Sequence, residues 1–331
     1  MGVARALSSG ALDAWFVDEL QRLNPDIDLQ PPLAKAGTFS LLSLGLAAFL
    51  GSLIPQYFHV IPLGRYQQLT PLAMPFIFAF VLGLTLVVIT VLLVKEHREA
   101  TRVESWKSGF KEVPSIIKTG FSLSRHNPTI LLLLGTTMVS GFSLIGLESF
   151  WQPHFANLLG DNQENTFFFG VIMGGSFVFG MLGNMLATPL TRRLNKRYAL
   201  VSAIFQGIWG GAIILLALQS NVLPAAATFW LAYVSMGVIN SPHSTLLNQE
   251  IPSEQRSAML SIASLTTYIG VMLGGLVLGY VAKNASINQA WAIAGVVLVV
   301  SLSLYWKIDA RQAVNRLPLT EAASRDTKLI A

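Results

Sequence analysis

The first residues that could do chemistry are two ionisable side chains in an apolar opening segment, MGVARALSSGALDAWFVDEL. Arg5 and Asp13 are eight residues apart, which is about 12 Å along a helix and roughly 80° around it, so both can face one cavity. An ionisable group inside a membrane helix is costly, and it is therefore a functional hypothesis by default. Because Asp18 and Glu19 follow closely, Asp13 fits the polar end of such a helix equally well.

Polar side chains also interrupt apolar stretches further along the chain. Glu148 lies in IGLESFWQPHF near the outer end of its expected helix, where it could be a site residue or an interfacial anchor. His243, in MGVINSPHSTLLNQ, could titrate near neutrality and take part in proton coupling, or it could simply be hydrated. The candidates for a substrate or proton pathway are Arg5, Asp13, Trp15, Glu148, Gln152, Gln206, Asn240, His243 and Tyr268.

Several kinds of catalytic or cofactor site have no motif in the sequence. The chain has no cysteine, so it has neither a thiolate nucleophile nor a thiolate metal site. It also has no His-x-x-x-His, no Glu-x-x-His pair on one helix, no Gly-x-Ser-x-Gly and no nucleotide-binding loop. We therefore expect no enzymatic activity, no metal and no cofactor.

Composition predicts an all-α polytopic membrane protein. Charged residues make up 12% of the chain and hydrophobic residues 53%, and the apolar residues are gathered into runs of bilayer length. Such runs are too long for barrel strands, so they must be helices. A partial helix is expected in the opening segment. The eight full helices are expected at 38–58, 70–94, 129–150, 166–189, 199–218, 224–247, 260–282 and 289–308.

The basic residues predict the orientation of these helices. Of the 22 Lys and Arg residues, 19 fall on one side of the expected bundle, and only Arg65 and Lys283 fall in the opposite connections. The positive-inside rule makes the basic side, with the C-terminus, cytoplasmic. The net charge of +5 is thus a topology signal, so nucleic acid is not an expected partner. We expect a monomer in the cell (cytoplasmic) membrane.

A long charged connection divides the chain. Residues 1–94 hold the partial helix and two full helices, and 95–128 form a cytoplasmic central loop. Residues 129–308 hold six helices that begin and end on the cytoplasmic side, and 309–331 form a cytoplasmic tail. The pieces before the loop match the fourth, fifth and sixth helices of a six-helix half.

Three stretches make the chain resemble the major facilitator superfamily, whose members have two six-helix halves joined by a cytoplasmic loop. The first, GNMLATPLTRRLNKRYAL, is similar to the basic loop motif of the family, in which Gly183, Arg193, Lys196 and Arg197 match. A cluster of basic residues in any cytoplasmic turn would look the same. Asn195 replaces the turn glycine, and Asn tolerates the left-handed conformation that this turn needs.

The second stretch, LNQEIPSEQRSAMLSIASLTTYIGVMLGGLVLG, resembles the loop between the fourth and fifth helices of a second half. Here we expect Ser253 to cap the restarting helix and Arg256 to face the lipid headgroups. The glycines that follow are expected to form either a static packing stripe or a moving one. They are Gly270, Gly274, Gly275 and Gly279.

The third stretch, RALSSGALDAW, resembles the fourth helix of a first half, with Arg5 and Gly10 near the family positions. This likeness implies that the chain starts inside helix four and lacks helices one to three, through a misplaced start codon or a truncated gene. We then expect no transport by the 331 residues alone, because alternating access needs two comparable halves.

The resemblance implies a function as well as a fold. A chain of this family would be a secondary active transporter that moves a small organic solute by alternating access, with proton-coupled efflux as one form. Drug-proton antiporters of this family usually carry a Gly-Pro pair in helix five. The helix expected at 38–58 has no such pair, so its sequence does not support an assignment as an antiporter. The alternative is a transporter-like receptor, scaffold or inactive fragment. Aromatic candidates for the cavity favour amphipathic solutes: Trp15, Trp209, Tyr233 and Tyr268.

Overall fold

The computed structural model of the chain describes residues 11–54, 61–62, 68–69, 73–93, 127–160 and 166–315. These residues form nine α-helices, one 3-10 turn and one antiparallel pair of two-residue strands. The elements are α2 (Ala11–Leu23), α3 (Gln30–Leu53), β1 (Ile61–Pro62), β2 (Gln68–Leu69), α4 (Met74–Leu93), α6 (Pro128–Leu159), α7 (Thr166–Arg193), α8 (Tyr198–Ala217), α9 (Val222–Glu250), η4 (Ser253–Gln255), α10 (Arg256–Asn284) and α11 (Ile287–Asn315).

Among the described residues, seven helices are long and apolar enough to cross a membrane. Their spans are Met74–Leu93, Pro128–Leu159, Phe168–Arg193, Tyr198–Ala217, Val222–Glu250, Ala258–Asn284 and Ile287–Ala313. The chain is therefore an all-α, multi-pass membrane protein, as composition predicted. Most of the predicted central loop (95–128) and of the predicted tail (309–331) lies outside the described residues, which include only 127–128 of the first and 309–315 of the second.

Most of the helices run further than the predicted spans, although α4 (Met74–Leu93) is shorter than the predicted 70–94 and α3 ends at Leu53 rather than 58. α3 begins at Gln30 rather than 38, α6 ends at Leu159 rather than 150, and α11 ends at Asn315 rather than 308. Hydropathy marks only the bilayer-crossing part of a helix, whereas the helix itself continues to the next turn signal. α3 has proline in its first turn, and α6 stops at Gly160, whose φ of 75° suits glycine.

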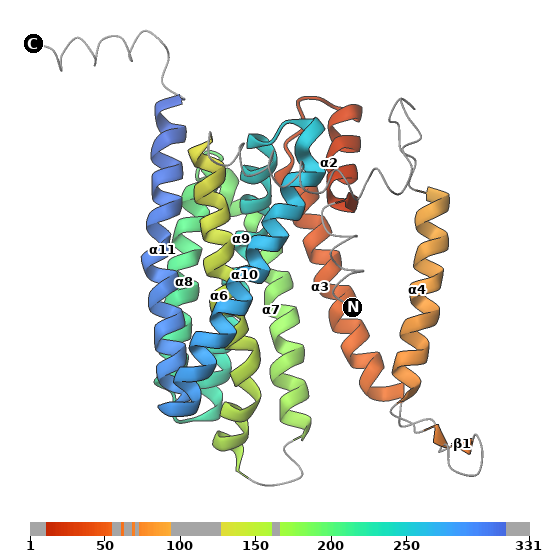
Figure 1. The fold of residues 1–331 in the computed structure, drawn as a ribbon, viewed down its shortest axis with the longest axis vertical. Coiled ribbons are helices and arrows are strands. Elements are labelled where there is room, and N and C mark those ends of the chain that lie inside the picture. Colours follow the sequence, from red (N-terminus) through yellow and green to blue (C-terminus); the bar gives the residue numbers. More distant parts are fainter. Residues whose placement is uncertain are drawn as a thin grey trace, which may run out of the picture.

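The described Lys and Arg residues lie almost all at one end of the molecule. In Figure 1 this upper end holds α2, the turn between α7 and α8, the start of α10 and the end of α11. The basic residues here are Arg22, Lys35, Arg192, Arg193, Lys196, Arg197, Arg256, Lys307 and Arg311, whereas Lys283 lies at the other end. We call this the basic end; its assignment to the cytoplasm stays a prediction.

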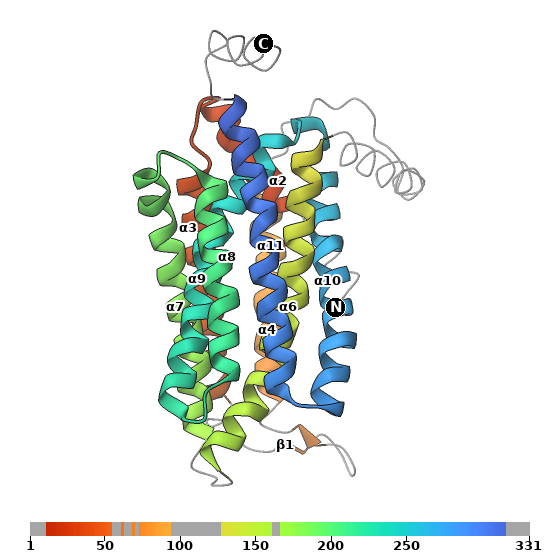
Figure 2. The ribbon, with the colours of Figure 1, turned by 90° about the vertical axis from the view of Figure 1, so that its left-hand side faces the viewer.

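Six helices, α6 to α11, form one bundle (Figure 2), in which α6 packs against α10, α7 against α9 and α8 against α11. α3 lies against α7 and α9, and α2 lies against α10. α4 stands apart from the bundle in Figure 1, and nearly all its side chains are exposed. The bundle core is aromatic at the end opposite the basic end, around Phe155, Phe229 and Trp291.

Glycines let the paired helices approach closely. A Cβ atom on Gly183 of α7, or on Gly270 or Gly274 of α10, would collide with a backbone oxygen of the facing helix. Gly275 and Gly279, in contrast, have no neighbouring atom within 4 Å of such a Cβ. The predicted packing stripe on α10 is thus right at two positions and wrong at two, because helical spacing turns the other two away from α6.

Candidate functional site

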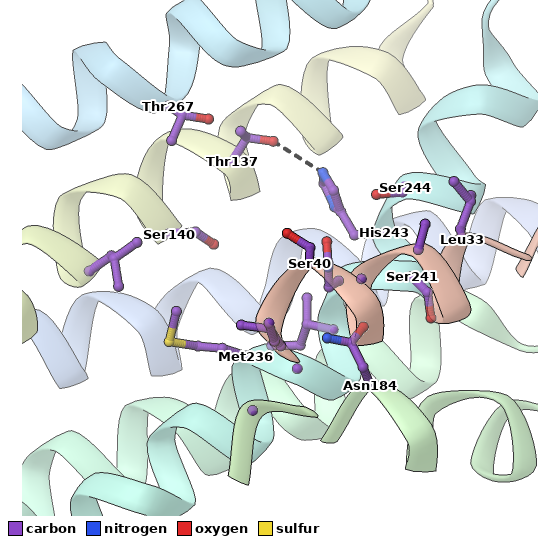
Figure 3. A pocket seen from close by; sticks show the side chains of 18 of the residues that line it. Leu33, Ser40, Thr137, Ser140, Asn184, Met236, Ser241, His243, Ser244 and Thr267 are labelled. Carbon is purple, nitrogen blue, oxygen red and sulfur yellow. Dashed lines mark hydrogen bonds between the residues drawn. The ribbon is translucent and has the colours of Figure 1, made fainter. Parts of the chain in front are cut away.

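A cavity of about 670 Å³ lies between the first part of the chain and the six-helix bundle. α3 forms one wall, α2 contributes Val17 at the basic end, and every helix of the bundle contributes to the other walls. The lining carries hydroxyl, amide and imidazole groups and one carboxylate, and no Lys or Arg among the described residues (Figure 3). The polar lining residues are Ser40, Thr137, Ser140, Glu148, Asn184, Trp209, Tyr233, Asn240, Ser241, His243, Ser244, Asn248, Thr267 and Tyr305.

His243 is held in this wall through both ring nitrogens. Tyr305 Oη lies 2.8 Å from Nδ1, and Thr137 Oγ1 lies 3.2 Å from Nε2. The Thr137 hydroxyl donates its one proton to the Leu133 carbonyl at 2.8 Å, so its oxygen accepts from Nε2–H. When the imidazole is neutral, Nδ1 accepts from the Tyr305 hydroxyl. His243 thus has two protein partners, whereas one expectation was a simply hydrated histidine.

Asn184 is a completely buried side chain of α7 that lines the cavity. Figure 3 shows its carboxamide directed towards α3. Neither Nδ2 nor Oδ1 has a hydrogen-bond partner in the described part of the chain. On the facing helix, a Cβ on Gly37 would stand 2.7 Å from Asn184 Oδ1 and 3.0 Å from Asn240 Nδ2. Two carboxamides therefore converge on one glycine.

Glu148 is the carboxylate of the cavity lining. Because α6 continues to Leu159, Glu148 lies about three turns inside the helix, and its expected place near the helix end is wrong. Its charge interacts with Tyr233 of α9. Trp209 and Tyr233 line the cavity, as expected for an aromatic solute site; their part in binding stays a prediction.

Three other predicted site residues lie away from the cavity. Gln206 is buried between α8 and α11, where its Nε2 donates to Ser301 Oγ at 2.9 Å. Gln152 is exposed on α6. Tyr268 is 45% exposed on α10 and points away from the cavity that its neighbour Thr267 lines. A polar or aromatic residue in an apolar run stands out as a candidate, but the sequence does not show whether its face of the helix meets the cavity.

The opening segment contributes Val17 to the cavity rather than the residues that we expected. Trp15 is half-buried on α2 and does not line the cavity. Arg5 lies outside the described residues, and so does the side chain of Asp13. A role for this pair in a cavity stays a prediction.

Three ion pairs at the basic end join helices and turns of the bundle to each other and to the first part of the chain. They are Asp18–Arg256, Asp28–Lys196 and Arg197–Asp309. The Arg256 side chain is 4% exposed against Asp18 of α2, so the expectation that it faces lipid headgroups is wrong. The expected Ser253 cap is wrong too, because Ser253 opens η4 and α10 starts after Gln255 without a side-chain cap.

The turn between α7 and α8 docks on the connection that precedes α3. Asn195 and Lys196 have φ of 53° and 58°, so Asn195 adopts the left-handed conformation that was expected of it. Asp28 accepts hydrogen bonds from Tyr198 Oη at 3.0 Å and from the Gln30 backbone N–H at 3.2 Å, and Lys196 Nζ lies 3.0 Å away. Burial acts to raise the pKa of Asp28, but these partners outweigh it and leave the pKa below its ordinary value.

Arg193, a residue of the predicted loop motif, is exposed at the end of α7. Arg197 pairs with Asp309 of α11, and the hydrogen bond and charge of Asp309 raise the pKa of Arg197. The predicted motif thus contacts another helix of the bundle through Arg197, and it contacts Asp28 in the first part of the chain through Lys196. A gating role for these contacts stays a prediction.

Sequence reasoning missed several residues that complete the cavity. Asn184 directly follows Gly183 in the stretch that resembles a loop motif. As a carboxamide in an apolar run, it could have been recognised as a candidate cavity residue. Ser40, Thr137 and Tyr305 had no such signal, because hydroxyl groups are common in membrane helices. No cluster of His, Asp and Glu among the described residues could hold a metal ion.

Comparison with known proteins connects the chain to a transporter. No protein-family model matches it. It is 24% identical over 172 residues to "Probable anion transporter 6" of Oryza sativa subsp. japonica. The match covers 52% of this chain and 39% of that protein, so it spans well under two thirds of the relative's length. The chain is thus distantly similar to a protein named as a probable anion transporter, and seven helices of its described part are long and apolar enough to cross a membrane.

Proposed function

We propose that this chain belongs to a secondary active transporter of the major facilitator type, which moves a small organic solute by alternating access when two comparable halves enclose the site. The observation that carries the proposal is the cavity, which has α3 on one side and all six helices of the bundle on the other. A solute site between two helical bodies can open to either face when one body rocks against the other. The volume of about 670 Å³ is in the range of small-molecule sites.

In this proposal, α6 to α11 form the complete second half, residues 129–308, and α2 to α4 belong to the first, residues 1–94. The basic end faces the cytoplasm of the cell membrane, as the positive-inside rule requires, and the C-terminus lies on that side. α2 covers the cavity at this end, where Asp18 pairs with Arg256. In this proposal, the contact of α2 with α10 covers the cytoplasmic end of the cavity.

Proton coupling, with efflux as its direction, centres on His243. Its ring lies in the cavity wall and is joined by hydrogen bonds to α11 and α6, so a change in its protonation alters contacts among three helices. Replacing His243 by Gln keeps a polar side chain but removes the titrating ring. We expect H243Q to lose the response of solute flux to an imposed pH gradient while binding of the solute persists.

An anionic solute is a second candidate, which the name of the rice relative favours. No Lys or Arg lines the described cavity, and Glu148 does, so neutral donors would have to hold the anion. Arg5 could supply a positive charge, but its position lies outside the described residues. The candidate is separable by experiment, because flux of matched anionic and neutral probes can be compared.

The proposal is tested by solute flux into proteoliposomes, with small organic anions, amides and amphipathic amines as probes. Ser140→Trp places a large ring in the cavity and should abolish saturable flux. The matched control is Leu223→Trp, on an 83% exposed position of α9, which should leave flux unchanged. Equal flux in both variants would contradict the cavity as the pathway. Binding without flux of any probe would favour the receptor or scaffold alternative.

A further inference from the structure

Tyr305 of α11 is a buried tyrosine whose hydroxyl group contacts the ring of His243. Its exposed fraction is 1%, and its side chain belongs to an apolar cluster with Leu133, Leu246 and Ile308. Packing of this density fixes the ring, whereas the hydroxyl proton can still turn about the C–O bond. Tyr305 can therefore donate a hydrogen bond in one arrangement and accept one in another without moving its ring.

The neutral ring of His243 uses Tyr305 as a donor. The side chain of His243 is partly exposed and lines the cavity, so a proton can reach it from there. Nε2–H donates to Thr137 Oγ1 (Figure 3), and Nδ1 accepts from the Tyr305 hydroxyl at 2.8 Å. The partner of one ring nitrogen decides which nitrogen carries the proton, so these two contacts select the Nε2–H tautomer.

The charged ring needs an acceptor in the same place, because both of its nitrogens are donors. Tyr305 Oη can accept from Nδ1–H once its own proton turns to another oxygen. Near this hydroxyl lie the hydroxyls of Thr136 on α6 and Ser202 on α8, both with an exposed fraction of 0%. Ser202 Oγ has no hydrogen-bond partner in the described part of the chain, so it is available to receive the turned proton.

We infer that Tyr305 is the positioning residue of His243 and that the hydrogen bond between them reverses when the ring takes up a proton. Tyr305 holds the neutral ring as a donor. It then accepts from Nδ1–H, while its own proton turns to Ser202. Tyr305 keeps its proton throughout, and the one added proton stays on the imidazole. The inference rests on the proposed function, in which His243 couples protons to transport, and it extends that coupling to α8.

The other titratable residues that line the cavity do not replace Tyr305. They are Glu148, eleven residues or about 16 Å along α6 from Thr137, and Tyr233, ten residues or about 15 Å along α9 from His243. The described lining residues of α2, α3, α7, α8 and α10 include no titratable group. Charged groups at the basic end have partners of their own, which are Asp18–Arg256, Asp28–Lys196, Arg197–Asp309 and Glu250–Asn127. The exposed ones are Lys35, Arg192, Arg193, Lys307 and Arg311.

The test follows the imidazole nitrogens by NMR in the full chain, held in lipid nanodiscs, as the pH is lowered. The chain has five histidines, and H243Q identifies the signals of His243 by their loss. Tyr305→Phe removes only the hydroxyl group. Ser202→Ala combined with Thr136→Val keeps Tyr305 but removes the oxygens to which its proton can turn. The matched control is Tyr280→Phe, at a 70% exposed position of α10 that does not line the cavity.

In the wild type and in Y280F, we expect a neutral ring that is protonated at Nε2 and accepts a hydrogen bond at Nδ1. Y305F should lose the signal of a hydrogen-bonded Nδ1. Its His243 should take up a proton at a pH lower by about one to two units, because the charged ring has lost its acceptor. S202A/T136V should keep the neutral-ring signals of the wild type and still require a lower pH for protonation.

Four results would overturn the inference. They are a wild-type ring protonated at Nδ1 when neutral, a wild-type ring that stays neutral until the protein unfolds, protonation of His243 in Y305F at the wild-type pH, and the same for S202A/T136V. The last would leave Tyr305 as a fixed partner without a reversal. Because the signals are recorded without flux, a protein with this reversal but no flux loses only the proposed function. Flux whose response to a pH gradient survives in Y305F contradicts only the role of Tyr305.

Discussion

Asp18 on α2 forms an ion pair with Arg256 at the start of α10, although 238 residues separate them in the sequence. The Arg256 side chain is 4% exposed, whereas that of Asp18 is 45% exposed. Asp18 therefore neutralises a cation that the surrounding helices have removed from solvent. The pair holds α2 against the bundle at the basic end of the cavity.

We expect Asp18→Asn to destabilise the protein by about 1–3 kcal/mol, because it leaves a buried charge without its counter-ion. Thermal unfolding in nanodiscs measures this loss. The double variant D18L/R256M should recover much of it, because an apolar pair needs no charge compensation. If the losses of the single variants D18L and R256M simply add up to the loss of the double variant, the two residues do not depend on each other.

Asp28 predicts a pH dependence. Its partners, Lys196 and Tyr198 among them, hold its pKa in the folded protein below the ordinary value of 3.8. The stability that it contributes is therefore complete above that value and is lost as the pH falls through the lower folded pKa. The unfolding temperatures of wild type and Asp28→Asn should differ at pH 7 and converge below about pH 4. A gap that stays constant down to pH 3 would contradict this assignment.

Two glycines of α10 provide a matched comparison of helix packing. Gly270→Ala would drive a methyl group into the Met138 carbonyl oxygen of α6, and we expect a loss of about 1–3 kcal/mol. Gly275→Ala meets open space, and the better helix former should leave the protein unchanged or more stable by roughly 0.5–1 kcal/mol. Thermal unfolding of both variants checks the prediction. Equal losses would show that α6 and α10 are not in close contact at Gly270.

Much of the fold could be predicted from the sequence. Long apolar runs show where helices cross the bilayer, and the bias of basic residues shows which connections share one side of it. The prediction failed where helices continue beyond the bilayer, as at Leu159, since hydropathy carries no information on that part. For the site, Asn240 and His243 stood out as polar residues in apolar runs. The Asp18–Arg256 pair could not be found this way, because tertiary packing alone brings the two residues together.

The most direct test of alternating access uses Ser40 of α3, which lines the cavity. The chain has no cysteine, so Ser40→Cys introduces a unique thiol. We would measure its modification by a membrane-impermeant maleimide in sealed vesicles of each orientation, with Leu84→Cys on the exposed surface of α4 as the lipid-facing control. Alternating access through this cavity predicts that S40C reacts from both faces and L84C from neither. Reaction of S40C from one face only, or from neither, would contradict alternating access through this cavity.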